Sequence, residues 1–114
     1  MLLVSAITTY DFIHQYSNAP EEVNYLRNLH RHLLHIEVSV EVFTEDREIE
    51  FYILKDTVDK YLRTVTFDKN ASCETVSSSI MSLITNLYGS NRKRIVKVQE
   101  DNNGYVLNIK EQGE

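Results

Sequence analysis

The sequence predicts an α+β domain in which an antiparallel sheet carries two helices on one face. Three observations predict this class: strand-like alternation near the start, strand-like alternation at the end, and two stretches of helical periodicity between them. Strands at both ends around a central helical pair are typical of α+β domains. With 114 residues, of which 42% are hydrophobic and 25% charged, residues 1–114 are expected to form one globular domain.

The first half of the chain contains three strand-like segments. Residues 1–10 are apolar and β-branched without Gly or Pro, and residues 11–28 form a polar connection that allows a helical turn after Pro20. Residues 33–43 alternate strictly between apolar and polar side chains, which indicates a strand with one buried face. Residues 48–53 alternate again after the turn "TEDR", so we expect them to pair with 33–43 as a hairpin.

The second half of the chain begins with apolar residues at helical spacing. Ser72 is a suitable N-cap and Gly89 a suitable stop for the second of two helices. Two strands joined by a tight turn at Gly104 then close the chain. The expected bounds are residues 54–65 and 72–88 for the helices, and 94–100 and 104–111 for the strands.

Charge and composition exclude some classes of function. A net charge of −5 argues against non-specific nucleic-acid binding, which needs Lys and Arg to neutralise phosphates. The basic cluster Arg92, Lys93, Arg94 and Lys97 follows a helix end, where cations interact favourably with the dipole; an anion site is the alternative. No apolar run approaches the roughly 20 residues of a membrane span. A single cysteine, Cys73, and no basic leader favour a cytoplasmic protein.

The first candidate site is a pair of histidines, His30 and His32, at the start of the long strand. Residues two apart in an extended chain project to the same side, so both imidazoles could bind one metal ion. Zinc in a catalytic site usually has three protein ligands, and His35 should face the other way. His14 lies on the preceding connection and could fold back. The alternative is a pair of histidines hydrogen-bonded at a strand end.

A second candidate site depends on Glu100, which ends a strand before the polar turn "DNN". A carboxylate there can accept two N–H donors from a planar heterocycle; the alternative is a solvated charge. Cys73 stands near a helix start, where the dipole would stabilise a thiolate. No base is near it in the sequence, so we expect a buried, small, apolar side chain. With three glycines, the chain has no Gly-rich phosphate loop.

Taken in order, these segments resemble the 6-pyruvoyl- and 6-carboxy-tetrahydropterin synthases of the tunnelling-fold group. "HRHLL" before "HIEVSVEV" is similar to their His-Gly-His-Asn-Tyr strand, and "IEFYILKDTV" to the stretch that opens their first helix. "SCET" is similar to their Ser/Thr-x-Glu-Asn helix start, and "VQEDNN" to their strand that ends in Glu. The resemblance implies a four-stranded ββααββ fold and a ring-shaped homo-oligomer with sites between subunits. It also implies zinc at His30 and His32, and a purine- or pterin-like ligand held by Glu100, Glu74, Ser72 and Thr75.

The chain also departs from the family pattern. Thr8 stands where the family has its third zinc ligand, so His14 or another group would have to replace it. The family's cysteine is missing from "NYLRNL", and Asp68-Lys69 lacks the histidine of its Asp-His pair. Losing one acid or base typically lowers a rate by about 10²–10⁴-fold, so standard synthase activity is not expected. We therefore expect a protein that binds or sequesters a purine-, pterin- or nucleotide-derived molecule. A zinc-dependent synthase-type lyase and a structural or interaction protein are the alternatives.

Overall fold

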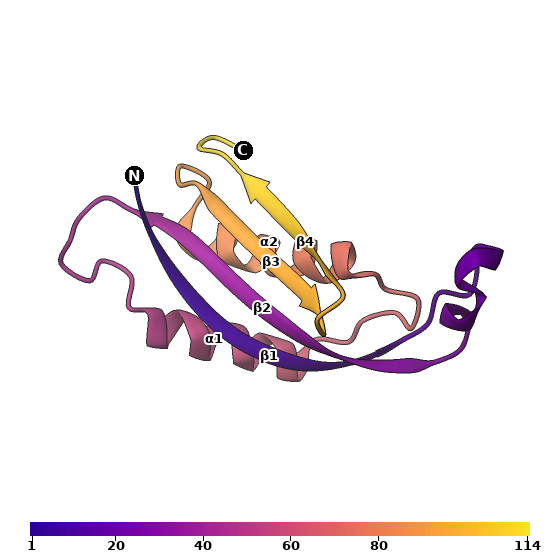
Figure 1. Cartoon of the computed structure of the whole chain (residues 1–114). Coiled ribbons are helices and arrows are strands. Elements are labelled where there is room, and N and C mark those ends of the chain that lie inside the picture. The colour runs from indigo at the N-terminus through magenta and orange to yellow at the C-terminus, as the bar shows by residue number, and fades with distance from the viewer.

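The computed structural model describes residues 1–114, which form one sheet with both α-helices on the same face (Figure 1). Two strands come first, then two α-helices, then two strands, so the predicted α+β class is confirmed, with the ββααββ order that the resemblance implied. No helix is long and apolar enough to cross a membrane. The elements are β1 (Leu2–His14), the 3₁₀ helix η1 (Glu21–Arg27), β2 (His30–Val42), α1 (Phe51–Thr64), α2 (Cys73–Tyr88), β3 (Arg94–Glu100) and β4 (Gly104–Lys110).

The sheet is antiparallel throughout, with the strand order β1-β2-β3-β4. β1 and β2 pair along their whole length, from Leu2 opposite Val42 to His14 opposite His30. β3 pairs only with residues 34–40 of β2. The paired ends of β1 and β2 therefore extend past the rest of the sheet toward η1, as the curved ribbons in Figure 1 show.

The core lies between the sheet and the two helices. Along β2 the even-numbered side chains face the helices, while α1 packs over β1 and α2 over β3 and β4. Burying one such aliphatic side chain contributes roughly 1.5–3 kcal/mol to the free energy of unfolding. The apolar residues that are at most 1% exposed are Leu34, Ile36, Val38, Val40, Leu54, Val58, Val76, Ile80, Ile84, Val96 and Val98.

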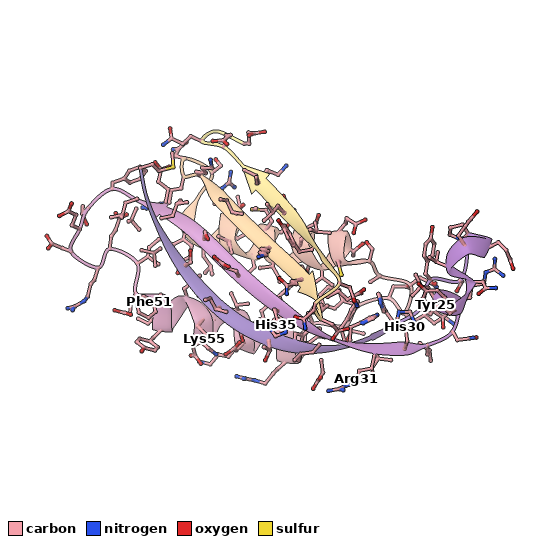
Figure 2. All side chains as sticks on the ribbon, viewed as in Figure 1. Tyr25, His30, Arg31, His35, Phe51 and Lys55 are labelled. Carbon is pink, nitrogen blue, oxygen red and sulfur yellow. The ribbon has the colours of Figure 1, made fainter.

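The expected hairpin of residues 33–43 and 48–53 is wrong. β2 has β1 on one side and β3 on the other, so no edge of β2 is left for a further strand. Helix α1 instead begins at Phe51. Glu50 is its N-cap, because the Glu50 carboxylate accepts the Tyr52 N–H at 3.3 Å. Phe51 and Lys55 both lie on this helix in Figure 2.

The first strand is longer than its predicted span of residues 1–10. β1 continues to His14 because each residue up to that point has a partner on β2. The helical turn allowed after Pro20 forms as η1, and β2 begins at His30, at the first of the paired histidines. His14 therefore lies on a strand and not on a loop, and this places it beside the two histidines of β2.

Candidate functional site

The candidate site lies where the helix-facing rows of the sheet continue past the apolar core. On β2, the row that contains Leu34 continues backward through His32 to His30. On β3, the row of Val96 and Val98 ends at Glu100, whose partner in the register is Leu34. Residues two apart on a strand share a face, so these polar groups project to the side on which the helices lie.

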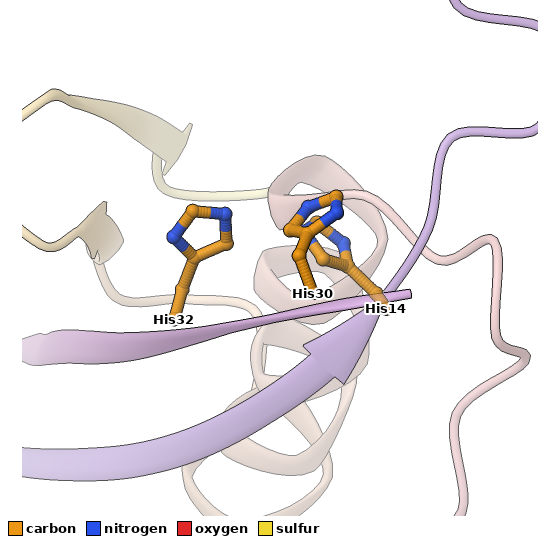
Figure 3. Close-up of side chains that lie close together, drawn as sticks. All are labelled: His14, His30 and His32. Carbon is orange, nitrogen blue, oxygen red and sulfur yellow. The ribbon is translucent and has the colours of Figure 1, made fainter. Parts of the chain in front are cut away.

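Three imidazoles meet at this position. His14 pairs directly with His30 across the β1–β2 ladder, and His32 is two residues further along β2. One potential ligand atom from each ring lies within 4.8 Å of those of the other two rings. The ring centroids are 4.5 Å apart for His14 and His30, and 4.8 Å apart for His30 and His32. Figure 3 shows the three rings side by side above the two strands.

Each ring is fixed by a hydrogen bond at its Nδ1, so its Nε2 is the nitrogen left for another partner. Bonds of this kind set the orientation and tautomer of histidines that bind metals in proteins. The three Nδ1 contacts are His14 with the Ala71 carbonyl oxygen at 2.8 Å, His30 with the Asn28 carbonyl oxygen at 2.8 Å, and His32 with a carboxylate oxygen of Asp101 at 2.6 Å.

The Nε2 atoms of His14 and His32 are buried and have no hydrogen-bond partner. A buried polar atom without a partner typically costs about 1–3 kcal/mol, and more than nine in ten such groups in proteins are satisfied. Both Nε2 atoms face the same carboxylate: Glu100 Oε1 lies 3.4 Å from His14 Nε2 and 3.5 Å from His32 Nε2. Neither approach has hydrogen-bond geometry.

A pocket of about 680 Å³ opens beside the histidines. Its walls come from the ends of the β1–β2 extension with the loop after β1, from η1, from the loop before α2 and the first turn of α2, and from the end of β3, the turn after it and the start of β4. The lining residues are His14, Gln15, Tyr16, Leu26, His30, Asn70, Ala71, Ser72, Cys73, Glu74, Glu100, Asn103, Gly104, Tyr105 and Val106.

The structure brings together most of the residues named from the sequence. Glu100, Glu74 and Ser72 all line the pocket, whereas Thr75 is not among the lining residues. Ser72 is the N-cap of α2, because its hydroxyl oxygen accepts the Thr75 N–H at 3.1 Å. The same first turn of α2 therefore brings a carboxylate, Glu74, to the pocket wall.

Cys73 is half-buried in the pocket wall, and its thiol donates to Glu100 Oε1 at 3.7 Å. Burial and the neighbouring carboxylates of Glu100 and Glu74 raise the pKa of this thiol to about 12. Burial and the two carboxylates therefore outweigh the helix dipole, which would favour the thiolate. A thiol that stays neutral is a weak nucleophile.

The third imidazole comes from His14, and Thr8 lies elsewhere. The Thr8 hydroxyl donates to Asp59 on α1, well up the β1 strand from the pocket. Tyr10, Phe12 and His14 are each two residues apart, and this alternation is the sequence signal that β1 continues to His14. Asp101, which holds His32, was not expected from the sequence.

No protein-family model and no curated protein matches this chain.

Proposed function

We propose that the chain binds a divalent metal ion, zinc by preference, through His14, His30 and His32. The observation that carries this proposal is the pair of buried, unpartnered Nε2 atoms in a three-histidine cluster whose Nδ1 atoms are already bonded. Neutral imidazole nitrogens suit zinc, and three histidines are a common protein ligand set for it. Donor atoms in a tetrahedral zinc site lie roughly 3.3–3.5 Å apart, so small side-chain rotations would close the 4.8 Å cluster around the ion.

The pocket beside the cluster supports a small-molecule ligand. Its volume lies within the roughly 300–1,000 Å³ of ligand sites, and Glu74 and Glu100 have no Lys or Arg partner in the chain. Free carboxylates accept N–H groups in charge-assisted pairs, which suits the N–H edge of a purine or pterin. A bound metal ion would act as a Lewis acid toward an oxygen of such a ligand. We therefore propose a metal-containing protein that binds or sequesters a purine-, pterin- or nucleotide-derived molecule.

A zinc-dependent lyase of the tetrahydropterin synthase type is the second candidate, and His14 favours it because it supplies the third imidazole. The chain's own acid and base groups favour binding instead. Leu26 lines the pocket from the segment where the resembled family has its cysteine. The raised pKa of Cys73 makes it a poor replacement. Asp68 accepts the Asn70 N–H at 2.8 Å and does not line the pocket.

A homo-oligomer with sites between subunits is part of the proposal. β1 and β4 are the two edges of the sheet, and an unprotected edge strand offers unpaired N–H and C=O groups to another chain. Three large apolar side chains of β4 are exposed, and the pocket reaches the start of this strand. A second copy on the β4 edge would therefore border the pocket. The exposed side chains are Tyr105, Leu107 and Ile109.

The metal proposal is tested by native mass spectrometry and metal analysis of the purified protein, with or without added zinc. We expect one zinc ion per chain and, in His14→Ala, an affinity more than about 100-fold weaker, because loss of even an outer partner costs 10–100-fold. His35→Ala is the matched control, since His35 is exposed on the same strand as His30 and His32 (Figure 2). Absence of zinc after supplementation, or equal losses in both variants, would contradict the proposal. The same spectra report the number of subunits.

The ligand proposal is tested by thermal shift with guanine, guanosine and pterin as probes on the zinc-loaded protein. A compound that binds only the folded chain raises the melting temperature in a concentration-dependent way. We expect a shift for at least one probe that falls in Glu74→Gln and stays in Glu37→Gln, a carboxylate outside the pocket. If no probe gives a Glu74-dependent shift, the purine or pterin class is wrong.

A further inference from the structure

We infer that Glu100 is the fourth ligand of the proposed metal site, so that protein groups close the coordination shell until a pocket ligand competes for this carboxylate. The inference rests on the proposed three-histidine site and goes beyond it, because Glu100 was expected only as an anchor for a heterocycle. It follows from the position, the distances and the charge of one side chain.

The first observation that supports this role is that a Glu100 oxygen lies close to two imidazole nitrogens without forming a hydrogen bond to either. Glu100 Oε1 lies 3.4 Å from His14 Nε2 and 3.5 Å from His32 Nε2. These separations match the roughly 3.3–3.5 Å between neighbouring donor atoms around a tetrahedral zinc ion. If a protonated imidazole were simply paired with Glu100, its Nε2–H would donate to Oε1, but neither ring does so. Three atoms that are close without bonding one another are suited to a shared cation.

The second support is the way the sheet presents the carboxylate. Glu100 is the last residue of β3, in register with Leu34, so it stands beside His32 on the helix-facing side. The turn after it is fixed by two backbone bonds: its carbonyl oxygen accepts the Asn103 N–H, and the Asp101 N–H reaches the Leu33 carbonyl oxygen, both at 3.0 Å. A metal ligand on a strand end held in this way is more accurately placed than one on a loop.

The third support is charge. The Glu100 side chain is 26% exposed and has no Lys or Arg partner; its neighbours are two imidazoles and the Cys73 thiol. A largely covered carboxylate without a cation is unfavourable, and a divalent ion held by neutral histidines supplies the missing charge. Glu74, the other pocket carboxylate, has no histidine contact and is not placed to do the same.

One consequence is competition inside the pocket. A heterocycle that donates N–H groups to Glu100 would draw the carboxylate away from the metal ion and free one position on it. The chain would then hold its metal ion in a closed shell when the pocket is empty and in an open shell when the pocket is filled.

The test uses the full chain loaded with Co²⁺, whose visible spectrum depends on the number and type of ligands, and a competing chelator to measure Co²⁺ and Zn²⁺ affinity. We expect Glu100→Gln to change the spectrum and to weaken both affinities at least about 10-fold, since even outer partners are worth 10–100-fold. Glu37→Gln is the control and should change neither, because Glu37 lies outside the pocket and projects to the side of β2 opposite His30 and His32. Circular dichroism checks that both variants are folded.

The outcomes separate this inference from the proposed function. If wild type binds Co²⁺ in a manner that needs His14 and His32, and Glu100→Gln has the same spectrum and affinity, the three-histidine site stands and the role of Glu100 is wrong. If wild type binds no Co²⁺, both are wrong. A crystal structure of the zinc-soaked protein tests the same point without any variant: we expect a Glu100 oxygen within about 2.0–2.2 Å of the ion, and a longer separation would overturn the inference.

Discussion

The helix-facing row of β3 has a charged residue at each end, and the two ends differ in how the chain satisfies them. Arg94 begins the row, is only 1% exposed and lies at the end of α2; Glu100 ends the row beside the histidines. The Arg94 guanidinium donates to the carbonyl oxygens of Arg92 and Glu111 and to the Thr85 hydroxyl. At the Glu100 end, two imidazole nitrogens have no such partner.

This difference separates a structural site from the proposed ligand site. At the Arg94 end, one side chain connects α2, β3 and the C-terminal segment, and the negative end of the α2 dipole favours its charge. The neighbouring Arg92 and Lys93 pair with Glu48 and Glu111, and Lys97 lies over the Tyr105 ring, so each member of the basic cluster considered as an anion site already has a partner within the chain. At the other end the polar groups remain available to a ligand.

Among the variants that test this comparison, we expect Arg94→Met to have the largest effect, which is on the free energy of unfolding. The change removes three hydrogen bonds and leaves their acceptors without a partner at a buried position, so we expect a loss of about 2–4 kcal/mol in the free energy of unfolding. Urea denaturation measures it. Lys97→Met on the same strand is the control, because Lys97 lies over the Tyr105 ring at the surface and should cost much less. Equal losses, or a loss of metal binding in folded Arg94→Met, would contradict the division into two ends.

The second largest effect is expected for Asp101→Asn, at the histidine end of the row, and it concerns the affinity for the metal ion. Asp101 accepts from His32 Nδ1 and from the Leu33 N–H, and these two contacts, His32 first, hold its pKa below the usual value although burial opposes them. An Asn that keeps the Leu33 bond would turn its NH₂ group toward Nδ1. The imidazole proton would then sit on Nε2, where the metal ion is proposed to bind.

We therefore expect Asp101→Asn to weaken zinc binding about 10–100-fold while the free energy of unfolding of the metal-free protein changes little. Isothermal titration with zinc measures the affinity. Asp11→Asn is the control, because Asp11 pairs with Arg31 on the exposed side of the same two-stranded extension. Unchanged zinc affinity in Asp101→Asn would show that the Asp101–His32 contact has no part in binding.

Much of the fold could be predicted because its elements have strong periodicity. The alternation of residues 33–43 and the apolar stripes of α1 and α2 each have one favourable partner surface, so pattern and packing agree. The strand predicted for residues 48–53 was wrong because a six-residue alternation also fits the start of a helix. With both edges of β2 occupied, the Glu50 cap and the burial of Leu54 decide for the helix.

The site was only partly visible in the sequence, for a different reason. His30 and His32 are two residues apart and could be found by local spacing. His14 reaches them only through the register of the β1–β2 ladder, which pairs it with His30 across a 15-residue connection that includes η1. Asp101 reaches His32 from a turn in which its backbone has a positive φ of 49°, a conformation that a strand pattern does not reveal.

The smallest effect concerns pH, at the Arg94 end of the sheet. Glu41 is 6% exposed, and its carboxylate accepts the Lys93 N–H and the Gln112 side-chain N–H, both at 2.9 Å. These two bonds, the Lys93 N–H first, hold the pKa of Glu41 below its ordinary 4.5 in spite of burial. A folded-state pKa below the unfolded one means that the ionised carboxylate stabilises the fold. This contribution is fully present above about pH 4.5 and is lost as the pH falls through the lowered folded pKa.

Glu41→Gln should therefore lower the free energy of unfolding of the metal-free protein at pH 7 by a small amount, because the amide oxygen can still accept the Lys93 N–H but carries no charge. The difference between wild type and variant should shrink as the pH falls below about 4.5, since the wild-type side chain also becomes neutral there. Urea denaturation at a series of pH values measures the difference. Glu37→Gln, on the same strand without a hydrogen-bonded carboxylate, should show no such trend. A difference that grows toward acid would mean that Glu41 is not stabilised in its charged form, and the polar groups at the Arg94 end of the sheet would then not all be satisfied within the chain.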